Sequence, residues 1–514
     1  MKRLLSVLCL AAISCAPAAT TPKPTTLADL RREAEAKPND RGAWHSVAMA
    51  ELFAPGGDAA RADRAVRRAR QLDMRDPELL FAQGLLADIH GRPSLAYDAY
   101  VAALDFAVRS DQEKLQPLVE AASYAVLGES GMVRGYRERT LQRLVPLLDW
   151  PGLSLAGRAA LADVLEPLAQ RGGDLALEAR IAARLGCATS FRVAGPFGPR
   201  ALLGFDDKPP ADPEKPLADR YDLGPGRGVR ATRALGAQIC SVHLGGGPVA
   251  EAGQTIAETT LRVAGAGDQI VRLDTPNTAE LFIDGRSVLR VDRRTVLGPR
   301  VVFLKLPLAA GDHRFVVRIS TRHPNPVLEL AMAPYAAADA AADLQPLAAN
   351  SAAPDFSLYL RASLALARGD ILAAREMLSS ATKARDASPL LLLQQAGIAL
   401  SDPLLPDGVR GDDARRYLNQ ALARDATLWG PVLQLASLAA KAGRVKEAIA
   451  TLRSAEQRFP EVPAVGLALV ELLRSKNFHA AADRVLARVR ELVPDACAPI
   501  TAELEAARAR DRYT

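Results

Sequence analysis

The chain has 514 residues, of which 49% are hydrophobic and 24% are charged, a balance that is ordinary for soluble globular proteins. At about 150 residues per domain, this length accommodates about three domains. The formal net charge is only +6, and the basic residues are spread along the sequence, which argues against a nucleic-acid-binding protein. We therefore expect no nucleic-acid partner.

The first 15 residues have the pattern of an export signal. Lys2 and Arg3 form a short basic start, and residues 4–13 form an apolar run that is too short for the about 20 residues of a membrane-spanning helix. Residues 16–26 are rich in Pro and Thr and cannot bury a core, so we expect a disordered tether there.

The end of this signal resembles a bacterial lipobox. The sequence AISC at residues 12–15 implies a lipid on Cys15, although the family pattern prefers leucine where Ala12 stands. Lipidation supplies several acyl chains, which anchor a protein stably. The resemblance therefore predicts a protein of the cell envelope, at the periplasmic face of the outer membrane. The alternative is cleavage after Ala18 or Ala19, which gives a secreted or periplasmic protein.

Five cysteines occur, and none forms a CxxC pair, so their spacing predicts no zinc or redox site. Cys187 and Cys240 are able to form a disulfide in an oxidising compartment. The alternative, which we favour slightly from the sequence, is that Cys187, Cys240 and Cys497 are separate buried thiols.

Residues 27–186 carry apolar side chains at helical spacing and predict a helical segment. Trp44 and Val47 lie on one apolar stripe of a first helix. Further helices are predicted for the runs 62–72, 115–127, 136–148, 155–168 and 175–185.

Residues 77–103 predict a close helix hairpin. Gly84 and Ala96 are small enough to let two helices approach, and Tyr100 fills the remaining space between them. The turn is expected at residues 91–93, where Gly and Pro occur together.

Residues 187–335 differ from the rest, because Gly and Pro become frequent and short β-branched runs replace the helical period. Asp284 and Gly285 separate two such runs and predict a type I′ hairpin. Short strands at close spacing favour an antiparallel β-sandwich. The predicted strands are 190–194, 259–263, 269–273, 279–283, 287–291, 301–306, 313–320 and 326–332.

Several motifs of this segment resemble jelly-roll modules of the galactose-binding-like and PA14-like kind. They are FRVAGPF at 191–197, GFDD at 204–207, AELFIDGRSV at 279–288 and LAAGDH at 308–313. The resemblance implies an accessory domain of a secreted bacterial protein, in which sugar or calcium sites lie on loops. No calcium-binding loop is visible in the sequence.

Four acidic residues follow the first of these motifs: Asp206, Asp207, Asp212 and Glu214. One interpretation is a metal or acid–base cluster. Because they lie in a Pro-rich loop, we favour a solvated acidic patch and predict no metal site.

Residues 336–353 are rich in Ala and predict a linker, and residues 354–514 return to the helical period. Helices are expected at 356–367, 371–381 and 390–400, and a charged capping helix at 502–510. Ala374 and Ala414 are 40 residues apart, so the loop 401–411 is about six residues longer than a 34-residue period requires.

The most regular part of the chain begins at Trp429. With an offset of 34 residues, Ala448 coincides with Ala482 and Leu452 with Leu486. This period with two helices per unit is typical of a helical solenoid.

The small residues of this part resemble those of the tetratricopeptide repeat (TPR). In the unit that starts at Trp429, Ala436, Ala448 and Leu452 stand at family positions 8, 20 and 24, and Pro460 stands at position 32. Gly84, Ala96 and Tyr100 take positions 8, 20 and 24 of an earlier unit. The predicted fold is therefore a multidomain α and β protein, with two TPR-like solenoid blocks on either side of an antiparallel sandwich in the sequence.

The TPR resemblance implies a scaffold that binds peptides or helices in a concave groove. Family positions that line the groove correspond here to Phe81, Asp88, Leu433, Lys441, Leu467, Glu471 and Arg474. The alternative for each is an ordinary packed or solvated helix residue.

Catalytic patterns are absent from the sequence. Ser380 and Lys383 satisfy SxxK without convincing SDN or KTG partners, and the glycine-rich runs at 224–228 and 245–247 do not lead into a phosphate-binding motif. Cys240 and His313 offer a conceivable nucleophile and base, but no family motif surrounds them. We therefore predict no enzyme, no catalytic residue, no metal and no cofactor.

These patterns together favour a non-catalytic envelope scaffold that binds protein or peptide partners and is attached to the membrane by its N-terminal lipid. The alternative is a glycan- or cell-wall-binding lipoprotein that acts through the β-sandwich. A hydrolytic enzyme is a third hypothesis.

Overall fold

The computed structural model describes residues 26–110, 112–198, 205–223, 228–245, 253–294, 298–321, 327–341, 354–383 and 386–496. Cys15, residues 1–25 and the capping helix expected at 502–510 lie outside the described residues. Within the described ranges, no helix combines the length and the apolar character that a membrane crossing needs.

The N-terminal part is helical, as its apolar period predicts. Asp40, Asp58 and Asp76 cap α2, α3 and α4, because each carboxylate accepts a backbone N–H of the first turn. Pro77 and Pro93 begin α4 and α5, where a missing N–H costs no helical hydrogen bond. The helices are α1 (Leu27–Ala36), α2 (Arg41–Phe53), α3 (Ala59–Leu72), α4 (Pro77–Ile89), α5 (Pro93–Arg109), α6 (Gln116–Gly128), α7 (Tyr136–Leu144), α8 (Leu155–Gly172) and α9 (Leu175–Leu185).

The middle part forms a β-domain of antiparallel strands. One sheet has the order β4-β1-β6-β11-β8-β9, a second has the order β10-β7-β12-β5, and β2 pairs with β3. The strands are β1 (Ser190–Phe197), β2 (Arg220–Asp222), β3 (Val229–Ala231), β4 (Arg233–Gly236), β5 (Ser241–His243), β6 (Gly253–Val263), β7 (Gly267–Asp274), β8 (Thr278–Ile283), β9 (Arg286–Val291), β10 (Val301–Leu308), β11 (Gly311–Thr321) and β12 (Val327–Pro334).

The two larger sheets share one apolar core. Val193 and Phe315 enter it from the six-stranded sheet, and Leu273 and Leu330 enter it from the four-stranded sheet. The turn between β8 and β9 has positive φ at Asp284 (50°) and Gly285 (82°), which confirms the predicted type I′ hairpin.

The C-terminal part is again helical, with α10 (Ala337–Ala341) at its start. The other helices are α11 (Pro354–Ala367), α12 (Ile371–Ser379), α13 (Pro389–Ser401), α14 (Asp407–Arg424), α15 (Trp429–Lys441), α16 (Val445–Arg458), α17 (Pro463–Arg474) and α18 (His479–Leu492). The loop predicted at 401–411 is shorter in the structure, because Ser401 ends α13 and α14 begins at Asp407; only residues 402–406 form a turn. Asp402 fixes this turn, because its buried carboxylate accepts hydrogen bonds from Arg375 (2.6 Å) and from the Leu404 N–H (3.0 Å).

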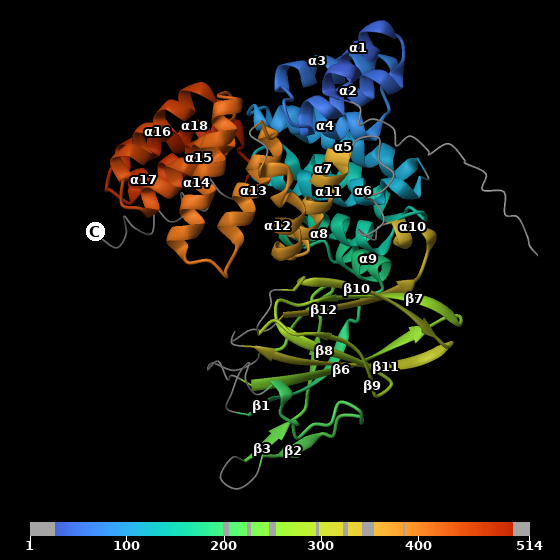
Figure 1. Ribbon diagram of the computed structural model, residues 1–514. Coiled ribbons are helices and arrows are strands. Elements are labelled where there is room, and N and C mark those ends of the chain that lie inside the picture. The colour runs from blue at the N-terminus through green and yellow to red at the C-terminus, as the bar shows by residue number, and fades with distance from the viewer. Residues whose placement is uncertain are drawn as a thin grey trace, which may run out of the picture.

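The two helical parts form one body in space, although the β-domain separates them in the sequence (Figure 1). Helix α11 packs against α2 and α6 of the N-terminal part. Phe356 of α11 lies 5.2 Å from Phe53 and 6.3 Å from Phe81 between ring centroids, inside a core to which both parts contribute. The structure is therefore a multidomain α and β protein with a single helical body.

The four-stranded sheet of the β-domain faces this helical body (Figure 1). Ile270 and Ala333 belong to the same apolar cluster as the N-terminal helices. A disulfide joins Cys187, at the end of α9, to Cys240 in the β-domain. The expectation of separate buried thiols is therefore wrong for these two cysteines.

Candidate functional site

The residues predicted to pack the first hairpin lie in its core. Gly84 of α4 faces Tyr100 of α5 so closely that a Cβ at Gly84 would lie 2.4 Å from two ring carbons. Ala96 is fully buried and Tyr100 is 2% exposed. Close helix approach therefore depends on a glycine at position 84.

The packing residues predicted in the C-terminal part also lie inside the helical body. Each is at most 3% exposed, and all belong to one apolar cluster. These residues are Ala436, Ala448, Leu452, Ala482 and Leu486.

The two predicted groove residues of the N-terminal part do not lie on an open groove. Phe81 is 3% exposed and packs between Tyr100 and Phe356, so a partner cannot reach it. The backbone carbonyl of Asp88 accepts a hydrogen bond from Trp429 Nε1 (2.6 Å), and burial raises the pKa of its carboxyl group to about 6. The C-terminal helices fill the space that the sequence assigns to a ligand.

The groove residues predicted on the C-terminal part remain closer to the surface. Lys441 at the end of α15 and Glu471 on α17 are exposed. Leu433 and Leu467 are partly buried against the core of these helices, and Arg474 lies 3.5 Å from Asp483. Because α15 packs beside α17, these residues occupy neighbouring helices.

The N-terminal and C-terminal helices meet along a seam of loops. At one end, the loop after α2 contacts the loop before α13. The Gly56 N–H donates to the carbonyl of Asp386 (2.9 Å), and Ser388 Oγ donates to the carbonyl of Leu52 (2.5 Å).

The seam continues along the turn between α4 and α5 and the segment before α7. A Cβ added at Gly91, in the turn between α4 and α5, would lie 2.8 Å from Val462 and 3.3 Å from Phe459 in the loop between α16 and α17. Farther along, the Gly135 N–H donates to the carboxylate of Asp495 (2.8 Å). The loops that connect successive C-terminal helix pairs therefore lie against loops of the N-terminal part.

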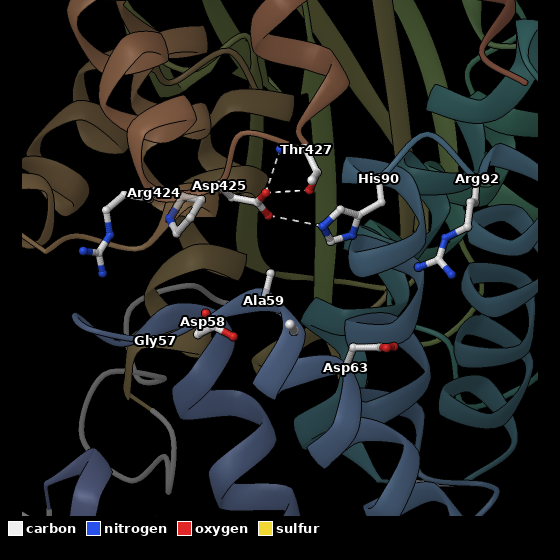
Figure 2. A pocket seen from close by; sticks show the side chains of 11 residues that line it. Gly57, Asp58, Ala59, Asp63, His90, Arg92, Arg424, Asp425 and Thr427 are labelled. Atoms are coloured by element: carbon white, nitrogen blue, oxygen red, sulfur yellow. Dashed lines mark hydrogen bonds and ion pairs between the residues drawn. The ribbon is translucent and has the colours of Figure 1, made fainter. Parts of the chain in front are cut away.

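A cleft of about 360 Å³ opens within this seam (Figure 2). It is bounded by the start of α3, by the turn after α4 and by the loop between α14 and α15. Its lining is Gly57, Asp58, Ala59, Ala60, Asp63, His90, Arg92, Pro389, Arg424, Asp425 and Thr427.

An ion pair crosses this cleft between the two helical parts. His90 points toward Asp425, and its Nε2 lies 3.2 Å from the carboxylate (Figure 2). The other ring nitrogen, Nδ1, lies 2.7 Å from the carbonyl oxygen of Leu86. Because both ring nitrogens face acceptors, the doubly protonated imidazolium satisfies both contacts.

The electrostatics of this pair follow from the same contacts. The hydrogen bond to Asp425 raises the pKa of His90, although burial opposes that effect. In return, the hydrogen bond from His90 lowers the pKa of Asp425 to about 2, and Thr427 adds donors to the same carboxylate. No sequence pattern indicates this pair, because its members are 335 residues apart.

Side chains of both charges line the cleft. Its lining includes carboxylates at Asp58 and Asp63 and guanidinium groups at Arg92 and Arg424. The hydroxyl of Thr427 donates to the carboxylate of Asp425, which also pairs with His90.

A second polar cluster lies where the helical body meets the β-domain. Arg272 of β7 is 3% exposed and donates to Glu329 (2.7 Å) and to Asp274 (2.8 Å). On the facing helix α8, burial raises the pKa of Asp163 to about 6 and that of Glu166 to about 7. Arg300 also donates to Asp274 (2.6 Å), so the four carboxyl groups of this cluster face two guanidinium groups. Deprotonation of Asp163 and Glu166 therefore leaves an excess of buried negative charge.

Cys240 and His313, considered as a nucleophile and a base, each have another partner in the structure. Cys240 is bonded to Cys187, so it offers no thiol. His313 Nδ1 lies 2.6 Å from Asp284, and its Nε2 lies 2.8 Å from the carbonyl of Ala309. Both ring nitrogens are therefore occupied within the β-domain.

The acidic residues of the β-domain do not converge on one point. Asp206 pairs with Arg290 and Arg294. Asp212 accepts a hydrogen bond from the backbone N–H of Glu214, a contact within its own turn. Asp207 contributes its carbonyl oxygen to a hydrogen bond from Gln254.

No protein-family model matches the chain, and no curated protein matches it. Among solved structures, it is similar to a beta-glucosidase from Kluyveromyces marxianus over 35% of this chain and 18% of that protein, with 10% identity and a TM-score of 0.20. A structure of beta-glucosidase from that organism in complex with glucose is similar over 27% of this chain and 16% of that one, with 14% identity and a TM-score of 0.18. A GH31 alpha-xylosidase from Xanthomonas citri is similar over 30% of this chain and 14% of that protein, with 17% identity and a TM-score of 0.15. The chain spans less than a fifth of each of these proteins, and TM-scores this low do not define a shared fold.

Proposed function

We propose that the chain is a non-catalytic scaffold of the bacterial cell envelope that binds protein or peptide partners on TPR-like helix pairs. The close packing of successive helices carries this proposal. A Cβ at Gly84 would collide with Tyr100, and a Cβ at Gly466 would lie 2.5 Å from Val489. Repeated helix pairs of this kind present extended binding surfaces.

The partner surface in this proposal lies on α15 and α17. Lys441 and Glu471 are exposed there, and Leu433 and Leu467 supply partly exposed apolar area on the same two helices. The N-terminal part contributes no such surface through Phe81, which is buried. The jelly-roll-like β-domain then serves as an accessory domain docked under the helical body.

Charge reversal of exposed residues tests this surface with little effect on the core. Purified full chain is used as bait for envelope proteins, in parallel with Lys441→Glu and Glu471→Lys. The control is Arg453→Glu, an exposed residue of α16 outside the proposed surface. We expect partners retained by the wild type and by the control to be lost with the two surface variants.

Identical partner sets for all four proteins would refute the proposed surface. Retention of purified peptidoglycan or glycans by the chain, unaffected by these variants, would move the binding role to the β-domain.

The envelope anchor in this proposal is a lipid on Cys15. Cells that express the chain are treated with globomycin, which blocks maturation of lipoproteins. Accumulation of a slower-migrating precursor supports the anchor, and Cys15→Ala should abolish that response. Normal processing under globomycin would exclude lipidation while leaving the proposed partner surface untouched.

A further inference from the structure

Three potential metal ligands meet between α2 and α4. His45 of α2, Asp76 at the cap of α4 and Glu78 in its first turn place their ligand atoms within 4.8 Å of one another. His45 Nε2 lies 2.9 Å from Glu78 and 3.9 Å from Asp76 Oδ2. No local sequence pattern indicates this group, because α3 and its loops separate His45 from the two carboxylates in the sequence.

The buried carboxylate of Asp76 is incompletely satisfied. Asp76 is 7% exposed, and its Oδ1 accepts the backbone N–H groups of Glu78 (3.0 Å) and Leu79 (3.2 Å). Its Oδ2 makes no hydrogen bond within the described part of the chain. The nearest cation, Arg41, lies 3.7 Å from Oδ2 and is held at 2.6 Å by Asp73 instead.

A single proton on His45 cannot satisfy both carboxylates. Its Nε2 has one proton, which faces Glu78, so Asp76 Oδ2 is left with long ion-pair contacts to His45 (3.9 Å) and Arg41 (3.7 Å). Contacts of this length compensate only part of the hydration that a largely buried carboxylate loses. A divalent cation would contact both carboxylates and the imidazole at once and would neutralise two negative charges.

The spacing of the three groups suits such a cation. Zinc binds imidazole nitrogen and carboxylate oxygen at about 2.0–2.2 Å, which puts tetrahedral ligand atoms about 3.4 Å apart. The two distances from His45 Nε2, 2.9 Å and 3.9 Å, lie on either side of that value. Asp76 is also oriented by its cap hydrogen bonds, as metal ligands are by their outer contacts.

We propose that His45, Asp76 and Glu78 form a binding site for a divalent transition-metal cation of the zinc type, which ties α2 to α4. One imidazole with two carboxylates favours Zn²⁺ or Co²⁺ over Mg²⁺, which prefers oxygen ligands and keeps its waters. His45 and Glu78 have side chains that are 18% and 34% exposed, so solvent water can complete the coordination.

Cobalt binding to the full chain tests this site. Free thiols are alkylated first, so that cysteines do not compete, and the metal is removed with a chelator. Titration with Co²⁺ should give a visible absorption band that saturates at one equivalent and is displaced by Zn²⁺. Zn²⁺ should also raise the melting temperature, and Mg²⁺ should do neither.

The variants assign the site to these side chains. His45→Ala and Glu78→Gln should weaken Co²⁺ binding by roughly tenfold or more, the loss that even outer-shell changes can cause. The control is His479→Ala, an exposed histidine on α18. Glu78→Gln preserves size at a partly exposed position, and circular dichroism without metal checks that it folds.

Two results would overturn the proposal. Absence of Co²⁺ binding to the wild type removes the site altogether. Binding that is equally tight in His45→Ala and Glu78→Gln places the metal elsewhere. If His45→Ala fails to fold, Glu78→Gln and Asp76→Asn decide the question, since the amide oxygen of Asn can still cap α4.

Discussion

Replacement of Gly84 by alanine tests the close approach of α4 and α5. The new Cβ would lie 2.4 Å from two ring carbons of Tyr100, whereas unstrained carbon contacts are about 3.5–4.0 Å. The ring must therefore move by about 1 Å. Tyr100 is 2% exposed, so it has no open space to enter.

The magnitude follows from two opposing effects on the free energy of unfolding. Overpacking of this kind costs about 1–3 kcal/mol. Alanine in place of glycine inside a helix contributes about 0.5–1 kcal/mol of stability. The matched control is Gly397→Ala in α13, where a Cβ would meet no atom within 4 Å. The two variants should therefore differ by about 1–3 kcal/mol, with Gly397→Ala the more stable.

Thermal melting followed by circular dichroism measures this difference. A change of 1 kcal/mol shifts the melting temperature by about 2–4 °C in domains of moderate size. In a Tyr100→Leu background, Gly84→Ala should no longer destabilise, because the ring carbons are gone. Equal stabilisation by Gly84→Ala and Gly397→Ala would refute the packing argument.

Three further predictions concern pH and redox conditions. The raised pKa of His90 contributes stability that is complete below its unfolded value of about 6.5 and is lost as the pH rises through the folded value. The lowered pKa of Asp425 adds stability above pH about 4, and this stability is lost as the pH falls towards 2. The two groups are therefore both charged near pH 5–6, where His90→Ala should destabilise most. Near pH 9, where His90 has lost its charge, the same variant should have little effect. Burial raises the pKa of Glu166 to about 7, so stability should fall between about pH 4.5 and pH 7, and Glu166→Gln should make this fall shallower. Reduction of the disulfide between Cys187 and Cys240, which are 53 residues apart, should lower stability by about 4 kcal/mol through the larger entropy of the unfolded chain.

Thermal melts at stepped pH values and with reductant check these three predictions. His479→Ala and Glu113→Gln are matched controls, because both residues are exposed. A pH profile of His90→Ala parallel to that of the wild type would contradict the ion-pair argument. A profile of Glu166→Gln as steep as the wild type would contradict the burial argument, and melting unchanged by reductant would contradict the loop-closure argument.

Local patterns predict the elements of this fold well. The 34-residue offset predicts helix positions from α15 to α18, because small residues recur wherever two helices touch. Short β-branched runs predict β1, β7 to β12 and the second half of β6. The Asp284–Gly285 turn between β8 and β9 needs only local backbone geometry. The strands β2 to β5 have three or four residues each, too few to show a period.

Contacts between distant segments do not follow from such patterns. Phe81 has the spacing of a groove residue, and only the packing of Phe356 against it buries the position. His90 and Asp425 come from different helical parts, and His45 meets Asp76 only because α4 packs back against α2. A helical period specifies which face of a helix is apolar, but not which distant helix covers that face.

The seam has a consequence for how this chain tolerates changes in length. Stacked helix pairs usually gain or lose whole units with little penalty, because each unit contacts only its neighbours. Here loops at the ends of the C-terminal pairs are held by loops of the N-terminal part, as Asp386 is by Gly56, Asp425 by His90 and Asp495 by Gly135. An added or deleted pair would shift every later loop away from its counterpart. The extra residues of the α13–α14 pair avoid this problem, because they form the turn at 402–406 and the first turn of α14. The seam instead uses the loops that join successive pairs. We therefore expect the chain to tolerate a change in the length of one helix better than a change in the number of helix pairs.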